Sequence, residues 1–226
     1  MSDAVVVAGI DVGGARKGYH AVALRGGRFL DCTATREPTA LLAWCLALEV
    51  AYVGVDAPCR WSSDGRKRAS ERALAAAGIA CFASPSRAAA LAHEAASSAA
   101  GKSGWYGWMF EGERLYAALT CEYVLHSGGA SVARSCFETF PQAVACALAG
   151  RIVSAKDKHR VRRALLAEAG VAQEALTSID LVDAALCGLA AQAYADGRWH
   201  GYGDDEDGRV IVPATPLVNA QLALDS

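Results

Sequence analysis

The sequence predicts a single α/β domain, spanning residues 1–226, built around a mixed β-sheet. Two observations predict this class. Three apolar segments near the N-terminus are separated only by glycine-containing turns, and from Pro38 onward strand-like segments alternate with helix-like ones. Strands joined by short turns pair antiparallel, whereas strands joined through a helix pair parallel, so we expect both kinds of pair. A chain of this length, with 53% hydrophobic residues, can bury one substantial core.

The first half of the chain predicts four strands and a helix. A continuous run of apolar and β-branched residues, such as that at 4–10, is typical of a strand buried in the centre of a sheet. The turn Arg25-Gly26-Gly27 predicts a hairpin between the two strands that flank it. Proline suits the first turn of a helix. The predicted strands cover 4–10, 19–24, 28–33 and 51–55, and the predicted helix begins at Pro38.

The second half predicts helices around one further central strand. The segment at about 79–130 is predicted to be a helical insertion, and its aromatic residues at 105–110 are placed to cover a site. The complete order predicts an RNase H-like mixed five-stranded sheet, order 3-2-1-4-5 counted along the chain, flanked by helices. Helices are predicted at 67–77, 88–96, 113–125, 141–149, 156–168 and 180–195, the fifth strand at 134–140, and an added edge strand at 209–212.

Four aspartates follow this plan closely. Asp11 ends the first strand and Asp56 ends the fourth, so both side chains should emerge at the same edge of the sheet if those strands are parallel neighbours. Asp180 and Asp183 are three residues apart at the start of the last helix and should share one face of it. Taken singly, each also fits a turn or a helix cap, and Asp180 in particular could be only a cap. Their joint placement predicts one acidic site.

Such a group of carboxylates favours metal-dependent chemistry. Two-metal hydrolysis of phosphodiesters uses carboxylates to hold the ions, and Mg²⁺ or Mn²⁺ prefers oxygen ligands. We therefore expect Mg²⁺ or Mn²⁺ as cofactor, with a two-metal site. Without metal, the carboxylates should repel one another and raise each other's pKa.

Glu138 is a further candidate for this acidic group. It lies at the end of the fifth predicted strand, directly before Thr139-Phe140-Pro141. It would either complete the site or form a structural ion pair with Arg87, because an ionised carboxylate at a sheet end needs a partner.

Basic residues are candidates for contacts with substrate. One basic run falls on the helix after residue 156 and another lies at 66–72, although charge runs are more often solvated faces. The net charge of −2 argues against tight non-specific binding to long nucleic acid, but leaves room for a local basic patch. The candidate substrate-binding residues are Lys17, Arg66, Arg87, Lys156, Lys158 and Arg162.

Several segments resemble known families. The sequence at 9–18 resembles the first strand of RuvC-type Holliday-junction resolvases, and the Asp-x-x-Asp-Ala pattern at 180–184 resembles their closing helix. More specifically, the chain resembles the domain-of-unknown-function 429 family of predicted RNase H-like nucleases. The segments that carry this resemblance are 53–58, 65–68, 82–88, 138–141, 156–159 and 180–185.

This resemblance implies specific roles for the acidic residues. It implies that Asp11, Asp56 and Asp183 are metal ligands, with Asp180 and Glu138 as the next candidates. Because the family's activity is itself inferred from its fold, the resemblance implies little about the substrate.

Three functions are therefore compatible with the sequence. The favoured one is a metal-dependent nuclease or phosphodiesterase acting on nucleic acid, with Asp11, Asp56, Glu138, Asp180 and Asp183 as catalytic candidates. The alternative is a non-catalytic RNase H-fold module that binds a nucleotide, a phosphorylated metabolite or a protein. A third is a small-molecule hydrolase or transferase that uses a pocket near residues 105–110.

The expected compartment is the cytoplasm, with no membrane partner. No signal peptide is recognised, and no apolar run is long enough to cross a bilayer. The eight cysteines form no Cys-x-x-Cys pair and are expected to be reduced core thiols.

Overall fold

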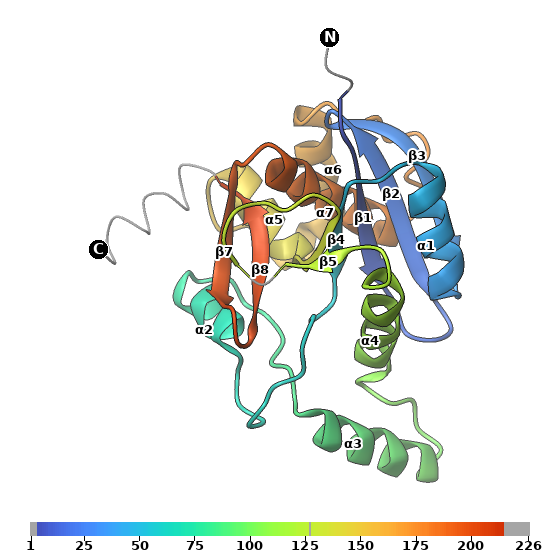
Figure 1. Ribbon diagram of the computed structural model, residues 1–226. Coiled ribbons are helices and arrows are strands. Elements are labelled where there is room, and N and C mark those ends of the chain that lie inside the picture. Colours follow the sequence, from blue (N-terminus) through green and yellow to red (C-terminus); the bar gives the residue numbers. More distant parts are fainter. Residues whose placement is uncertain (1–3, 127, 215–226) are drawn as a thin grey trace.

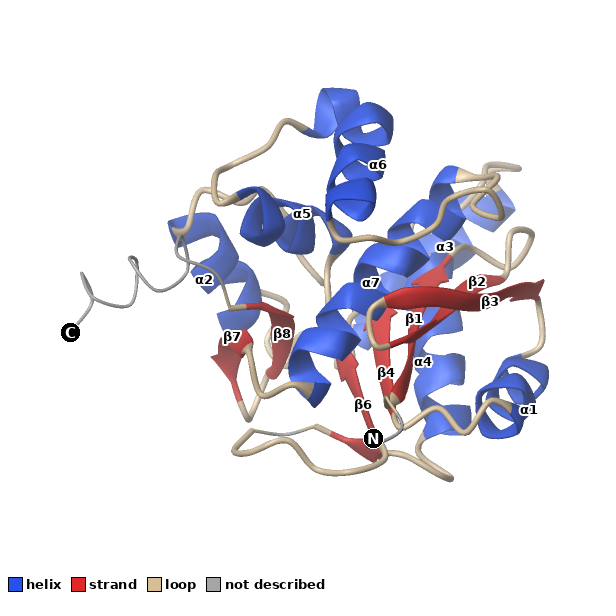
Figure 2. Ribbon diagram, turned by 90° about the horizontal axis from the view of Figure 1, so that it is seen from above, coloured by secondary structure: helices blue, strands red, loops and turns tan. Residues whose placement is uncertain are grey.

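The sheet is the feature that positions the acidic residues. In this computed structural model, which describes residues 4–126 and 128–214, the strand order is β3-β2-β1-β4-β6-β8-β7, with β5 paired to β6 (Figures 1 and 2). Its first five positions are the predicted order 3-2-1-4-5, so the predicted RNase H-like α/β fold is confirmed. The strands are β1 (Val6–Val12), β2 (Tyr19–Arg25), β3 (Arg28–Thr35), β4 (Tyr52–Asp56), β5 (Val124–Leu125), β6 (Ser135–Glu138), β7 (Trp199–Asp204) and β8 (Gly208–Pro213).

The prediction of five strands is too few, since the described sheet has eight. The added edge strand predicted at 209–212 corresponds to β8, but it lies inside the sheet, parallel to β6 and antiparallel to β7. The sequence of β7 is Trp-His-Gly-Tyr-Gly-Asp, and its glycines and lack of β-branched residues hide the strand. Residues 124–125 were predicted as the end of a helix and instead form the short strand β5.

Helices cover both faces of this sheet (Figures 1 and 2). One apolar core lies between the sheet and α1 and α4, and the other lies between the sheet and α5, α6 and α7. Within the described residues, no helix is long and apolar enough to span a membrane. The helices are α1 (Pro38–Ala47), α2 (Ala69–Ala76), α3 (Arg87–Ala99), α4 (Gly107–Leu119), α5 (Pro141–Ala149), α6 (Lys158–Glu168) and α7 (Ile179–Ala195), with a 3₁₀ turn at Ala155–Asp157.

Helix α7 lies unusually close to the central strands. A Cβ atom added to Gly9 on β1 would lie 2.0 Å from the carbonyl oxygen of Ala184 and from the amide nitrogen of Gly188. A Cβ on Gly54 of β4 would lie 2.7 Å from the carbonyl oxygen of Cys187. Only glycine permits such an approach, so α7 packs backbone against backbone on the two strands that carry Asp11 and Asp56.

Candidate functional site

Asp11 and Asp56 lie side by side at one edge of the sheet. Strands β1 and β4 are parallel, and their register pairs Asp11 with Asp56 at the carboxyl ends of the strands. Side chains alternate between the faces of a strand, so these two aspartates lie on the face of Gly9 and Gly54, which α7 covers. Asp11 is 9% exposed, and Asp56 is half-buried.

Helix α7 adds two further carboxylates. Ser178 caps this helix, because its hydroxyl accepts a hydrogen bond from the backbone nitrogen of Leu181 at 3.1 Å. Asp180 and Asp183 follow in the first turns, and Asp183 is buried. Since the serine caps the helix, capping does not account for Asp180.

Burial and mutual repulsion perturb three of these carboxyls. Burial, followed by the charges of Asp183 and Asp180, raises the pKa of Asp11 to about 7. Burial and the charges of Asp11 and Asp183 raise the pKa of Asp56 well above its ordinary value. Burial also raises the pKa of Asp183, although Arg162 opposes that effect. The charge of Asp183 therefore acts on both Asp11 and Asp56, and the charge of Asp11 acts on Asp56.

Part of the predicted basic helix faces this acidic group. Arg162 on α6 is buried and forms an ion pair with Asp183, and it also donates a hydrogen bond to the side-chain oxygen of Gln142 at 3.2 Å. The charge of Lys158 lowers the pKa of both Asp11 and Asp183. This side of α6 is thus directed at the aspartates and is not a solvated face.

Lys17 lies in the turn between β1 and β2 and pairs with Asp180. Its Nζ atom is 3.0 and 3.1 Å from the two carboxylate oxygens, and its side chain is 62% exposed. The solvent-exposed ammonium group of Lys17 therefore lies at one side of the four aspartates.

Replacing Lys17 by alanine is expected to tighten Mn²⁺ binding by about twofold to fivefold, because an exposed ion pair of this kind is worth up to about 1 kcal/mol. The free energy of unfolding should change by less than about 1 kcal/mol for the same reason. Isothermal titration calorimetry measures the first quantity and urea unfolding the second. Arg16→Ala is the matched control, since it removes an exposed charge from the same turn. Equal tightening in both variants would contradict a specific role for the Lys17–Asp180 pair.

His20 is a site residue that the sequence did not indicate. It lies on β2 directly opposite Asp11, and one ligand-type atom each from Asp11, His20 and Asp180 lie within 4.8 Å of one another. Its Nδ1 atom is buried without a hydrogen-bond partner. Oxygen and imidazole nitrogen are both ligands for Mn²⁺, so this trio is a candidate metal-binding group. The pairing of His20 with Asp11 depends on the register of β1 and β2 across the turn at 13–18, which the sequence pattern does not specify.

Glu138 faces the other side of the sheet. Strand β6 is parallel to β4, and its register pairs Glu138 with Val55, one position before Asp56. Glu138 therefore points to the face of the sheet opposite α7. Its charge still contributes to raising the pKa of Asp56, but it is not a member of the aspartate group.

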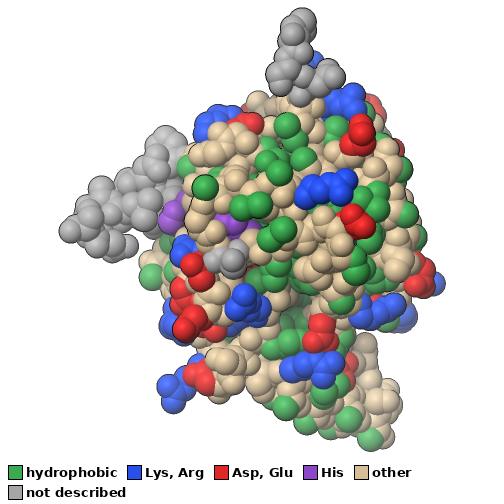
Figure 3. Space-filling model, in the orientation of Figure 1, with side chains coloured by type: hydrophobic (Ala, Val, Ile, Leu, Met, Phe, Trp, Pro, Cys, Tyr) green, Lys and Arg blue, Asp and Glu red, His purple; other side chains and the backbone are tan. Residues whose placement is uncertain are grey.

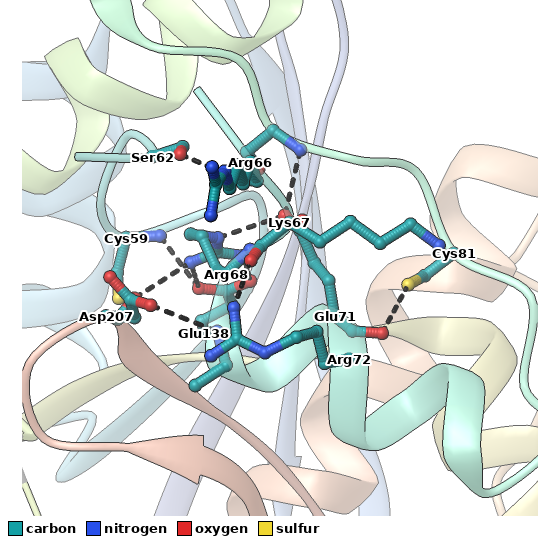
Figure 4. A network of polar contacts seen from close by, with 12 residues as sticks. Cys59, Ser62, Arg66, Lys67, Arg68, Glu71, Arg72, Cys81, Glu138 and Asp207 are labelled. Carbon is teal, nitrogen blue, oxygen red and sulfur yellow. Dashed lines mark hydrogen bonds and ion pairs between the residues drawn. The ribbon is translucent and has the colours of Figure 1, made fainter. Parts of the chain in front are cut away.

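A buried arginine holds Glu138 (Figure 4). Arg68, only 2% exposed, places its two terminal nitrogens 2.8 and 2.5 Å from the carboxylate oxygens, and its Nε lies 3.0 Å from Glu71. The backbone nitrogen of Cys59 donates a further bond to Glu138 at 3.0 Å. The prediction of a Glu138–Arg87 pair is therefore wrong, since Arg87 pairs with Glu113 at 2.8 Å.

The other basic candidates lie outside the aspartate group. Arg66 is exposed beside Asp64, at 3.9 Å. Lys156 is exposed on the 3₁₀ turn before α6. Arg87 lies over the ring of Phe110 at 5.7 Å, near the start of α3. Of the six predicted substrate contacts, Lys17, Lys158 and Arg162 are those whose charges act on the four aspartates.

The surroundings of Asp11 and Asp56 are compatible with a bound divalent cation. Asp180 pairs with Lys17 and Asp183 with Arg162, whereas neither Asp11 nor Asp56 forms an ion pair within the described ranges. Two adjacent carboxylates, one buried and one half-buried, without a bonded counter-charge are costly unless they are protonated or bind a cation. The donor set fits a hard divalent ion held by Asp11 and Asp56, with His20 and Asp180 close to Asp11.

The strand order and the aspartates at its edge define an RNase H-like α/β protein with an acidic site. The family model described as "Protein of unknown function (DUF429)" matches residues 9–207, so the chain belongs to this family. Among solved structures it is similar to Thermus thermophilus RuvC, with 18% identity, 85% of this chain and 97% of that chain covered, and a TM-score of 0.41. Comparison with curated proteins gives no match.

Proposed function

We propose that the protein is a metal-dependent phosphodiesterase that hydrolyses a phosphodiester in nucleic acid. One observation carries the proposal: Asp11, which is buried, and Asp56, which is half-buried, are paired across two parallel strands and form no ion pair among the described residues. Carboxylates arranged in this way are what a bound Mg²⁺ or Mn²⁺ needs, and Asp183 is the third ligand in the proposal. When bound, such an ion stabilises negative charge on the phosphoryl oxygens and makes water a stronger nucleophile.

The residues of the chain have separate tasks in this proposal. Asp11, Asp56 and Asp183 hold the cation, and Asp180 or His20 can complete its ligands or orient a water molecule. Arg162 fixes the position of Asp183 through their ion pair. Lys17 and Lys158 provide positive charge beside the aspartates, where a phosphate group can pair with them.

The alternative is a non-catalytic module of the same fold. It would be favoured if arginine or lysine neutralised Asp11 and Asp56 as ordinary structural charges. Arg162 and Lys17 instead pair with Asp183 and Asp180, which leaves the central pair for a cation. The chemistry of the site therefore supports the enzyme over the module.

The test is Mn²⁺- or Mg²⁺-dependent cleavage of a panel of labelled single-stranded, double-stranded and branched nucleic acids. Asp11→Asn and Asp183→Asn are each expected to lower the rate by at least about a hundredfold, since even residues that only support a metal ligand contribute tenfold to a hundredfold. Asp196→Asn is the matched control, because Asp196 lies at the opposite end of α7 and pairs with Arg198. Full activity in both site variants would rule out the proposal.

A further inference from the structure

A partly enclosed hollow lies next to the aspartates. We call it the Ser84 hollow. It has about 430 Å³ of space not filled by protein atoms, including the part that is open to solvent. The room inside the hollow is about 70 Å³, so a ligand would fill it with one part and extend into its open side. Asp56 forms part of its wall, so the hollow and the acidic site share a border. The residues that the argument uses are Asp56, Phe82, Ser84, Trp108, Glu138 and Phe140.

Three aromatic side chains line the Ser84 hollow. Phe82 comes from the loop before α3, Trp108 from α4 and Phe140 from the turn after β6, and the rings of Phe82 and Trp108 meet edge to face at 5.9 Å. Most of the exposed lining is apolar. Aromatic walls of this kind suit a flat ring, because stacking on an aromatic side chain is favourable for every nucleobase.

Apart from Asp56 at its border, the charged groups of the hollow are already paired with one another. Arg68 binds both Glu138 and Glu71, and the backbone nitrogen of Ser84 donates to Glu71 at 2.9 Å. Away from Asp56, the hollow therefore offers no free charge to an ionic group and is better matched to a neutral one.

Ser84 has a polar side-chain atom that makes no hydrogen bond. The residue is only 2% exposed, and its Oγ atom is buried with no hydrogen-bond partner. A buried hydroxyl without a partner is costly, and a hydroxyl can both donate and accept. The edge of a nucleobase carries both donors and acceptors, so it can satisfy this group where a plain hydrocarbon ring cannot.

We infer that the Ser84 hollow binds the base of a nucleotide whose phosphate lies at the aspartates. The inference rests on the proposed function for the position of the phosphate, and it defines the substrate as an unpaired nucleotide rather than an intact duplex. The neutral aromatic hollow takes the base, Asp56 forms the border, and the acidic site takes the phosphate with its cation. The face shown in Figure 3 has interspersed positive and negative side chains and no broad basic field.

The test compares ligands that differ only in the base. Binding of the four ribonucleoside 5′-monophosphates and of ribose 5-phosphate to the full chain is measured by calorimetry in the presence of Mn²⁺. At least one nucleotide is expected to bind about tenfold or more tightly than ribose 5-phosphate, which is the contribution of one stacked base. Ser84→Ala and Trp108→Ala should each reduce that ratio, while leaving the affinity for ribose 5-phosphate unchanged.

The controls separate this inference from the proposed function. Trp105→Ala is matched to Trp108→Ala, because Trp105 lies three residues away and is 64% exposed outside the hollow. Ser84→Ala removes a hydroxyl that makes no hydrogen bond, so it should fold normally. Equal affinity for all five ligands would overturn the base site whether or not Mn²⁺ binds. Mn²⁺ binding is monitored separately by electron paramagnetic resonance. Base-dependent nucleotide binding in the absence of Mn²⁺ binding would support the base site in the hollow and contradict the metal site.

Discussion

Asp11→Asn is expected to stabilise the metal-free protein at pH 8 by about 2–4 kcal/mol and to abolish tight Mn²⁺ binding. Burial and two neighbouring carboxylates raise the pKa of Asp11 from 3.8 to about 7. Each pKa unit corresponds to about 1.4 kcal/mol, so the ionised form costs on the order of 4 kcal/mol in the folded state. Asparagine has nearly the same shape without the charge, and it also relieves the repulsion on Asp56.

The pH dependence of stability follows from the same shift. Between pH 4 and pH 7 the unfolded chain has lost the Asp11 proton and the folded chain still holds it. The folded state therefore binds more protons, and the free energy of unfolding should fall as the pH rises from about 4 to about 7 and level off above it. The raised pKa of Asp56 acts in the same direction, so the fall should become shallower in Asp11→Asn but should not vanish.

Urea unfolding of the metal-free protein at a series of pH values checks this prediction. Asp64→Asn is the control of opposite sign, because a hydrogen bond from the Arg66 backbone lowers the pKa of that exposed carboxyl. The Asp64→Asn variant should therefore be no more stable than the wild-type protein at neutral pH. A wild-type protein whose stability rises between pH 4 and pH 7, with no gain in Asp11→Asn, would show that the aspartates do not repel one another.

Arg68→Ala should destabilise the fold by about 3–5 kcal/mol, as removal of one partner from a buried ion pair does. Arg68 is the shared cation of two buried carboxylates, Glu71 and Glu138, and it also donates to the backbone oxygen of Asp207 at 3.2 Å. These contacts connect α2, β6 and the turn before β8 (Figure 4). Alanine would leave both carboxylates buried without their cation.

Arg66→Ala gives the matched comparison, two residues away. The Arg66 side chain is 87% exposed and lies 3.9 Å from an exposed aspartate, so its loss should change stability by less than about 1 kcal/mol. Chemical denaturation of both variants under the same conditions is the measurement. Similar small changes in the two variants would mean that water reaches the Arg68 network in solution.

The parts of the fold that the sequence predicted are those with a strong local signal. The strands β1 to β4 are largely apolar segments separated by glycine turns or a proline-initiated helix, so their order could be inferred. The hairpin of β7 and β8 was only half predicted. Glycines in β7 remove its propensity signal, and the position of β8 inside the sheet depends on contacts with β6.

The site divides in the same way. Strand order alone predicts that Asp11 and Asp56 meet, because both end parallel neighbours. His20 and Glu138 depend on register, and a shift of one residue reverses the face of a side chain. Arg68 belongs to a basic run that is typical of a solvated surface, and only the tertiary fold brings two carboxylates to it. Propensity and charge pattern contain no information about such distant partners.

The contact of α7 with Gly9 and Gly54 also affects how the molecule opens. Because the helix backbone rests directly on β1 and β4, the backbone that carries the aspartates of α7 cannot move away from Asp11 and Asp56 while the helix stays on the sheet. Their separation requires the helix to leave the sheet, which removes the largest shared core of the protein. Amide hydrogen exchange in the middle of α7 should therefore proceed only through global unfolding, and a bound cation should slow it by the full free energy of binding.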